Sequence, residues 1–413
     1  MPAAYSTSKA YESGSSAGRR RAKTGKRMLS LCLAAALLLS VPAQGCGTDS
    51  RDDEGTVRIA VVSDIHFSLR SDASIYPLME RIGDLVNTLA DEVIARRPDA
   101  LILCGDNTNS GRESDESALC AVLRRIAEAG IPVIAVTGNH DFDLGSPEQF
   151  LRSYAGLCTA ETRDEASLSF RTHVGPVCIL AMDDNYATRG RSVRFSEATM
   201  HWLENELREA SEKSETVLFV SHHNVLPGGE DASDSAYMIQ NPELRDLLGR
   251  YGVRLCLSGH RHSQEILNHT SLYEIVSAMP VAAPHLFGWI TIGDDHLSYQ
   301  AETIDFASYG GPYGLTDISD YDRYRSQSFR EMLERQTDWE LLDPATQERV
   351  LELFWMFMEA YGRGSIHEVR EEILNDPCYQ DFLQVFYATN YGPWMAAVLI
   401  SDPLPGNKLE VDL

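Results

Sequence analysis

The chain has 413 residues, 43% of them hydrophobic, which is enough for two domains and excludes an intrinsically disordered protein. Its formal net charge is −25, and −31 remains when residues 1–45, with seven basic and one acidic side chain, are set aside. A protein with this much negative charge repels long polyanions, so we do not expect a DNA or RNA polymer as a partner. An anionic small substrate would need a local positive charge, and bound metal ions are the obvious source.

The first 46 residues are typical of an export signal. A basic stretch ends at Arg27, and the apolar run over 28–43 is shorter than the roughly 20 residues of a membrane-spanning helix. The run ends in the sequence AQGC, which resembles a bacterial lipoprotein signal, and its last residue is Cys46. We therefore expect an exported protein that faces outward and is anchored to the cell membrane by a lipid on Cys46, followed by a tether over 47–55. An uncleaved signal anchor is the alternative.

Between residues 56 and 303, short apolar runs alternate with amphipathic stretches. The apolar runs predict buried strands, and the amphipathic stretches predict helices between most of them. We expect strands at 57–62, 100–104, 132–136, 177–182, 216–220, 253–257, 272–278 and within 288–303, and helices at 76–97, 114–129, 196–211 and 241–251. This alternation predicts a layered α/β domain with its helices outside, and antiparallel strands towards its end.

The sequence changes character after residue 305. A loop rich in glycine and proline over 310–314 precedes helical periodicity at 321–336, 344–361, 366–374 and 379–391. These patterns predict a small helical bundle over 320–400, with an aromatic core and no ligand cluster, whose protein partner the sequence does not identify. The eight cysteines include no CxxC pair, so we expect neither a cysteine zinc site nor a disulfide framework.

Five polar clusters follow predicted strands. They are Asp64-Ile65-His66, Gly105-Asp106-Asn107, Gly138-Asn139-His140-Asp141, Ser221-His222-His223 and Gly259-His260-Arg261-His262. Because the carboxyl ends of strands in α/β sheets form the ligand crevice, we expect the five clusters to meet. Imidazole, carboxylate and amide groups bind divalent metals, and extended backbone would point residues two apart toward one site. The glycines would allow a close approach of the backbone.

In order, these clusters resemble the pattern D-x-H, G-D, G-N-H-D/E, H and G-H-x-H of the calcineurin-like metallophosphoesterases. The resemblance covers about residues 56–303 and implies a layered α/β/β/α sandwich, here with the small C-terminal helical bundle appended. It implies that one metal ion is held by Asp64, His66 and His262, a second by Asn139, His222 and His260, and that Asp106 bridges both.

The same resemblance implies a chemistry. The cofactors would be two divalent or mixed-valence metal ions, chosen from manganese, iron and zinc. A hydroxide between the ions would attack the phosphorus of a small phosphate-ester substrate. His140 would be the catalytic residue that contacts the phosphate and protonates the leaving group, which suits an imidazole.

The sequence around two of these motifs is similar to the class III cyclic-nucleotide phosphodiesterases. Some exported members of that group have an additional helical bundle. The segment from Gly105 to Glu113 and the run HHN at 222–224 carry this similarity, although Asn107 stands where that group has an apolar residue. We therefore expect a phosphodiester substrate, with cyclic nucleotides as one candidate. His223 and Asn109 are candidate substrate-binding residues, the alternatives being a supporting position for the first and a turn for the second.

Other residues receive less specific interpretations. Asp141 would orient a metal ligand or cap a helix, and the run from Asp183 to Asn185 is interpreted as a solvated turn. His173 and Cys178 are interpreted as an ordinary surface residue and a small core residue. Two other functions stay open: a phosphomonoesterase or nucleotidase on the same scaffold, and a non-catalytic surface lipoprotein that uses the fold for binding.

Overall fold

The computed structural model describes most of the chain beyond the expected export signal. The described residues are 55–70, 77–184, 193–227, 238–319, 339–387, 391–400 and 405–413, together with 331 and 334. The expected signal, most of the tether and most of the helix predicted at 321–336 lie outside this part. No described helix is both long and apolar enough to cross a bilayer.

Two β-sheets form the centre of the fold. The six-stranded sheet has the order β13-β12-β11-β1-β2-β3, and the seven-stranded sheet has the order β4-β5-β6-β7-β8-β10-β9. The strands of the first are β1 (Val57–Val62), β2 (Ala100–Cys104), β3 (Val133–Val136), β11 (Leu286–Ile292), β12 (His296–Thr303) and β13 (Lys408–Asp412). Those of the second are β4 (Thr162–Arg163), β5 (Phe170–Val174), β6 (Val177–Ala181), β7 (Thr216–Val220), β8 (Leu255–Ser258), β9 (Glu265–His269) and β10 (Leu272–Val276).

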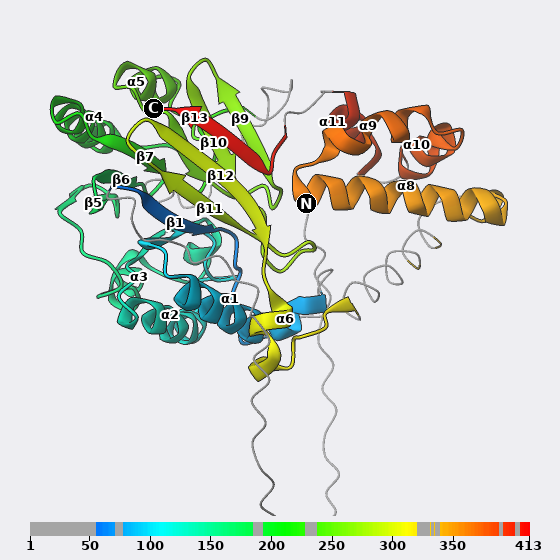
Figure 1. Cartoon of the computed structure of the whole chain (residues 1–413), viewed down its shortest axis with the longest axis horizontal. Coiled ribbons are helices and arrows are strands. Elements are labelled where there is room, and N and C mark those ends of the chain that lie inside the picture. The colour runs from blue at the N-terminus through cyan, green and yellow to red at the C-terminus, as the bar shows by residue number, and fades with distance from the viewer. Residues whose placement is uncertain are drawn as a thin grey trace, which may run out of the picture. The chain divides into compact units, whose positions relative to one another are not determined.

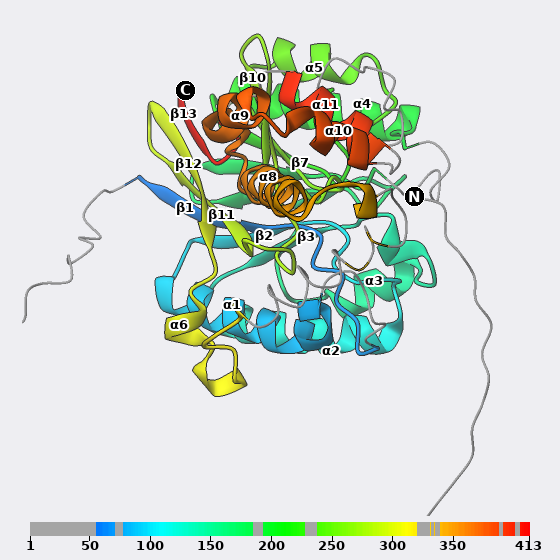
Figure 2. The same ribbon diagram turned by 90° about the vertical axis from the view of Figure 1, so that its right-hand side faces the viewer.

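The sheets pack face to face, and helices cover their outer faces (Figure 1, Figure 2). One apolar cluster joins Ile59 and Val61 of the first sheet to Ile179 and Leu218 of the second, all fully buried. Each such aliphatic side chain contributes about 1.5–3 kcal/mol of hydrophobic free energy. The first sheet's outer face packs against α1 (Ile82–Arg96), α2 (Glu113–Glu128) and α3 (Pro147–Ser153), and the second's against α4 (Glu197–Glu212) and α5 (Leu244–Arg250). The predicted α/β/β/α sandwich with C-terminal helices is therefore confirmed.

Strand pairing places the metal-motif loops together. β1 lies between β2 and β11, parallel to β2, and β2 is parallel to β3. In the second sheet β6, β7 and β8 are parallel neighbours. The carboxyl ends of neighbouring parallel strands therefore lie side by side within each sheet.

Some elements differ from the predictions. β11 and β12 pair antiparallel as expected, but β10 is parallel to β8 and antiparallel to β9. The strands β5 and β9 were missed because polar residues interrupt their apolar pattern, as Arg171, Thr172 and His173 do in β5. β13 was missed as well, and it returns the chain to the first sheet after the C-terminal helices. The domain boundaries themselves stay a prediction.

The C-terminal helices have a core of their own. They are α8 (Pro344–Arg363), α9 (Ile366–Asn375), α10 (Tyr379–Tyr387) and α11 (Tyr391–Ile400). The stretch predicted as one helix at 379–391 therefore contains the whole of α10 and the first residue of α11. Phe354 and Phe357 are almost completely buried in this core, as the aromatic pattern predicted, and so is Phe386. Asp343 caps α8 by accepting the N–H groups of Ala345 and Thr346.

Candidate metal centre

The five sequence clusters converge in the structure. They follow β1, β2, β3, β7 and β8, and their side chains form two overlapping groups of possible metal ligands. The ligand atoms within each group lie within 4.8 Å of one another. One group contains Asp64, His66, Asp106 and His262, and the other contains Asp106, His222 and His260. The expected convergence of strand ends is therefore present in the described residues.

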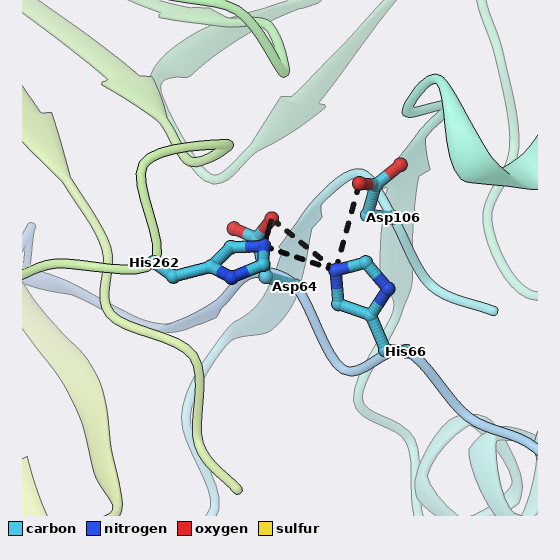
Figure 3. A group of neighbouring side chains, drawn as sticks. All are labelled: Asp64, His66, Asp106 and His262. Atoms are coloured by element: carbon cyan, nitrogen blue, oxygen red, sulfur yellow. Dashed lines mark hydrogen bonds and ion pairs between the residues drawn. The ribbon is translucent and has the colours of Figure 1, made fainter. Parts of the chain in front are cut away.

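The first group is compact (Figure 3). His66 Nε2 lies 3.1 Å from His262 Nε2 and 3.6 Å from Asp106 Oδ2. Asp64 Oδ1 lies 3.3 Å from His262 Nε2. Ligand atoms that each bind one ion at about 2.0–2.2 Å are separated by roughly 3–3.6 Å, so this geometry fits a bound cation.

The second group adjoins the first through Asp106. His222 Nε2 lies 3.3 Å from Asp106 Oδ2 and 3.2 Å from His260 Nδ1. Asn139 Oδ1 lies 3.2 Å from His222 Nε2, which brings an amide oxygen to the same point. The Nδ1 atom of His222 lies 2.9 Å from the carbonyl oxygen of Cys104, so the ring turns its Nε2 toward the group.

One carboxylate oxygen stands between the two groups. Asp106 Oδ1 accepts the backbone N–H of His140 at 2.8 Å. Asp106 Oδ2 is buried, and among the described residues it has no hydrogen-bond partner, although it faces both His66 and His222. Burying an unsatisfied carboxylate oxygen is costly unless a cation compensates it. The donor set therefore fits a pair of metal ions that share Asp106.

The backbone at these positions is unusual. Positive φ angles occur at five of the predicted ligands: Asp64 (53°), His66 (48°), Asp106 (47°), His260 (69°) and His262 (58°). Non-glycine residues rarely adopt this left-handed conformation, which costs on the order of 1 kcal/mol or more each. The expectation that extended backbone would align residues two apart was wrong, because the left-handed turns re-aim each side chain individually.

Loop-to-loop contacts hold these turns in place. Asp64 and His66 donate their N–H groups to the carbonyl oxygens of Gly105 and Asp106, at 3.1 and 2.9 Å. A Cβ atom at Gly138 would lie 2.1 Å from Asp106 Oδ1, and one at Gly259 would lie 2.4 Å from Asp64 Oδ2. Only glycine permits these approaches, as the sequence predicted.

Charges in the site favour the metal-binding protonation states of Asp106, His66 and His260, but not that of His222. Burial alone would raise the pKa of the Asp106 carboxyl, but the imidazoles of His222 and His66 hold it well below its usual range. Burial lowers the pKa of His66 to about 4 and that of His260 to about 2, which keeps both rings neutral. Burial also acts downward on His222, but the adjacent Asp106 carboxylate raises its pKa to about 10. A bound ion must displace this proton, so we expect metal affinity to fall on acidification.

The interpretation of Asp184 as part of a solvated turn was wrong. Its carboxylate is completely buried, and Oδ2 accepts the N–H groups of His222 at 3.1 Å and of His223 at 2.7 Å. Asp183 is also buried, and it accepts from the Thr137 hydroxyl at 2.8 Å. Asn185 lies outside the described residues. An acid three residues after a buried strand was the signal that could have identified Asp184 as a support for the site.

Asp141 supports the loops of the site. Its oxygens accept the backbone N–H groups of Gly138, Asn107 and Thr108 at 3.0, 3.2 and 2.8 Å, rather than contacting a ligand side chain. Burial and the nearby Asp106 raise its pKa to about 6. The amide of Asn107 donates to Asp141 Oδ2 and to the carbonyl oxygen of Val136, so this departure from the family pattern is structural.

The remaining candidates lie in different surroundings. His140 is 40% exposed, its ring centroid is 4.9 Å from that of His66, and its Nδ1 lies 2.9 Å from Asp143 Oδ2. His223 is buried, and its ring contacts Asp184 and packs 4.1 Å from the His260 ring. Asn109 is exposed in the loop after β2, where its N–H donates to the carbonyl oxygen of Phe67.

Comparison with known proteins gives consistent results. The family described as calcineurin-like phosphoesterase matches residues 57–264. The chain is 25% identical over 276 residues to a glycerophosphodiester phosphodiesterase of Enterobacter lignolyticus, covering 62% of this chain and 93% of that protein. It is 28% identical over 217 residues to a Synechococcus protein named "Probable cyclic nucleotide phosphodiesterase", covering 52% and 76%.

Among solved structures, a dimetal phosphatase from Danio rerio aligns with 17% identity and a TM-score of 0.47, covering 60% of this chain and 96% of that one. The family match spans half of the chain and contains every predicted ligand, and those ligands meet at the strand ends of two packed sheets. The chain therefore belongs to the calcineurin-like phosphoesterase family and is a metal-dependent phosphoesterase.

Proposed function

We propose that the protein hydrolyses small phosphate diesters at a centre of two metal ions. The observation that carries this proposal is the buried Oδ2 atom of Asp106, which faces imidazoles of both ligand groups and has no hydrogen-bond partner among the described residues. Two ions that share one ligand lie close enough to act on the same phosphate group.

In this proposal each ion has its own side chains. Asp64, His66 and His262 hold one ion, Asn139, His222 and His260 hold the other, and Asp106 bridges them. When bound, the ions lower the pKa of water to give a nucleophile and offset the negative charge of the phosphate. Asp184 keeps the backbone of His222 and His223 in place, and His223 lies behind His260 as a supporting residue.

His140 is the proposed proton donor. It follows the ligand Asn139, and its exposed ring lies edge-on to His66 at the surface of the centre. The Asp143 carboxylate orients the ring through Nδ1, which leaves Nε2 to address the leaving group of a substrate. An imidazole there can donate a proton to the departing alkoxide without occupying a metal position.

The preference for diesters rests on the similar proteins. Both relatives described above carry names of enzymes that act on phosphodiesters, one of them on cyclic nucleotides. The decisive comparison is the kcat/KM of the manganese-loaded protein for bis-p-nitrophenyl phosphate against p-nitrophenyl phosphate. We expect the diester to be preferred, after which cyclic nucleotides and glycerophosphodiesters would be compared. Preference for the monoester would favour the phosphomonoesterase or nucleotidase alternative.

We also propose that the protein acts outside the cell membrane through a lipid on Cys46. The support is the sequence of residues 1–46, which combines a basic stretch, a short apolar run and the terminal cysteine. Palmitate labelling of the native host's protein should give a membrane-bound, labelled product. Cys46→Ala should lose the label, and an equally labelled variant would contradict the assignment.

A further inference from the structure

A second cluster of ligand-type side chains lies at the opposite ends of the strands. His173 in β5, Cys178 in β6 and Glu215 directly before β7 place a ring nitrogen, a sulfur and a carboxylate oxygen within 4.8 Å of one another. His173 and Cys178 are direct cross-strand partners, which puts their side chains on one face of the sheet. The five strand residues of β7 separate Glu215 from the loop that carries His222, which is roughly 16 Å at about 3.3 Å each.

The atoms that face one another in this cluster are unsatisfied. His173 Nε2 lies 3.3 Å from Glu215 Oε2, yet their geometry is not that of a hydrogen bond. Both atoms are buried and have no hydrogen-bond partner among the described residues. The Cys178 side chain next to them is completely buried. Two orphaned acceptors beside a thiol indicate a position that a cation would fill.

The other nitrogen of the ring is already engaged. His173 Nδ1 lies 2.8 Å from Glu161 Oε2 and 2.9 Å from Oε1, so in the neutral ring Nδ1 donates its proton to this carboxylate. The lone pair of Nε2 then faces the lone pairs of Glu215. Metal-binding histidines commonly have this arrangement, in which a carboxylate on one nitrogen orients the ring and makes the other more basic.

The local charge also favours a cation. Four carboxylates, those of Glu161, Glu206, Glu209 and Glu215, lie near the two fixed cations Arg171 and Lys213. The excess of negative charge is what one divalent ion would neutralise. The side chains of His173 and Glu215 are 21% and 17% exposed, so the cluster is open to solvent on one side.

We propose that His173 Nε2, Cys178 Sγ and Glu215 Oε2 form a separate zinc-type site with water as its fourth ligand. Sulfur, imidazole and carboxylate together suit zinc or cobalt, whereas manganese prefers oxygen ligands. In the metal-free protein burial raises the pKa of the Cys178 thiol to about 12. The sulfur–metal bond therefore forms with release of the thiol proton to solvent. This site does not depend on the substrate proposed above.

Cobalt binding tests the site directly. The two ligand groups of the catalytic centre contain no sulfur, so a near-ultraviolet thiolate-to-cobalt absorption band can arise only from another site. We expect this band when Co²⁺ is added to the chelator-treated full chain, with three ions bound per chain. Cys178→Ala should remove the band and one ion, while turnover of bis-p-nitrophenyl phosphate changes less than about twofold.

Cys256→Ala is the matched control, because Cys256 is equally buried in β8 of the same sheet but lies outside the cluster. It should keep the band. His173→Gln alters a partly exposed position and should weaken cobalt binding at this site at least about tenfold, even if the core variant folds poorly. Absence of the band at saturating cobalt, or its persistence in both Cys178→Ala and His173→Gln, would overturn the proposal. The cluster would then be an ion pair of His173 with Glu161 and Glu215.

Discussion

The two ends of the seven-stranded sheet present metal-ligand side chains in opposite ways. At the carboxyl ends of β7 and β8, His222, His260 and His262 stand on loops and lie near the buried carboxylate of Asp106, and the backbone of His260 and His262 is strained and left-handed. At the amino ends of β6 and β7, His173 and Cys178 occupy regular, paired strands. Strain of the first kind is maintained only where the surrounding structure determines it, which is common at catalytic sites. The second kind needs no such strain, because cross-strand pairing already puts the two side chains on one face of the sheet.

The largest effect should come from the ligand that both ions share. Asp106→Ala removes the only predicted bridge, and we expect both ions to be lost and kcat/KM to fall at least about a thousandfold, or roughly 4 kcal/mol. Metal analysis and diester hydrolysis measure the two losses. Asp164→Ala, which changes a buried aspartate in the turn between β4 and β5, is the control and should retain both ions. If Asp106→Ala kept both ions, Asp106 would not be the shared ligand that distinguishes the catalytic end of the sheet from the end with His173 and Cys178.

His140 should separate chemistry from metal binding. His140→Ala leaves every predicted ligand in place, so both ions should stay bound, while the loss of the proton donor lowers kcat by about a hundredfold to ten-thousandfold. The loss should be smaller for a substrate with a good leaving group, such as p-nitrophenolate, than for an alkyl diester. Full activity on the alkyl diester would contradict the proposed role.

Asp184 should have a moderate effect, because it acts through the backbone of His222. In the carboxylate, Oδ2 accepts both buried N–H groups and Oδ1 contacts His223 Nδ1, whereas Asp184→Asn leaves only one oxygen. We expect metal affinity or activity to fall about tenfold to a hundredfold. Titration of the chelator-treated variant with manganese measures the change. An affinity equal to that of the unmodified protein would show that the loop holds its shape without this carboxylate.

A further effect concerns stability and lies outside both metal clusters. Burial raises the pKa of Glu274 in β10 from 4.5 to about 7, although Val225, Leu226 and Ser258 donate to it. The folded state keeps a proton that the unfolded chain releases, so this carboxyl's contribution to the free energy of unfolding is full below pH 4.5 and is lost as pH rises through 7. The expected loss is roughly 3 kcal/mol, at about 1.4 kcal/mol for each pKa unit.

Glu274→Gln cannot ionise, so its free energy of unfolding should fall less between pH 5 and pH 7.5 than that of the unmodified protein. Urea unfolding of both proteins at several pH values measures this difference, and the metal-linked pH dependence cancels because both share the centre. Parallel pH profiles would show that Glu274 ionises normally in the folded state.

The sequence predicted the catalytic end well because its ligands are grouped. Pairs such as Asp64 and His66 are close along the chain and follow apolar runs that only a strand explains. Their left-handed conformation was not predictable, since it arises from contacts with a loop about 40 residues away. Asp184, Glu274 and the members of the cluster around His173 were missed. Each of them is an isolated polar residue in the sequence, and its partners in the structure come from other strands.

The central claim is that strand-end loops hold a pair of ions bridged by Asp106. Manganese titration of the chelator-treated chain, followed by electron paramagnetic resonance, tests it most directly. Two Mn²⁺ ions per chain with an exchange-coupled spectrum are predicted from the two ligand groups that share this residue. Binding of a single ion, or of two ions without magnetic coupling, would contradict the claim.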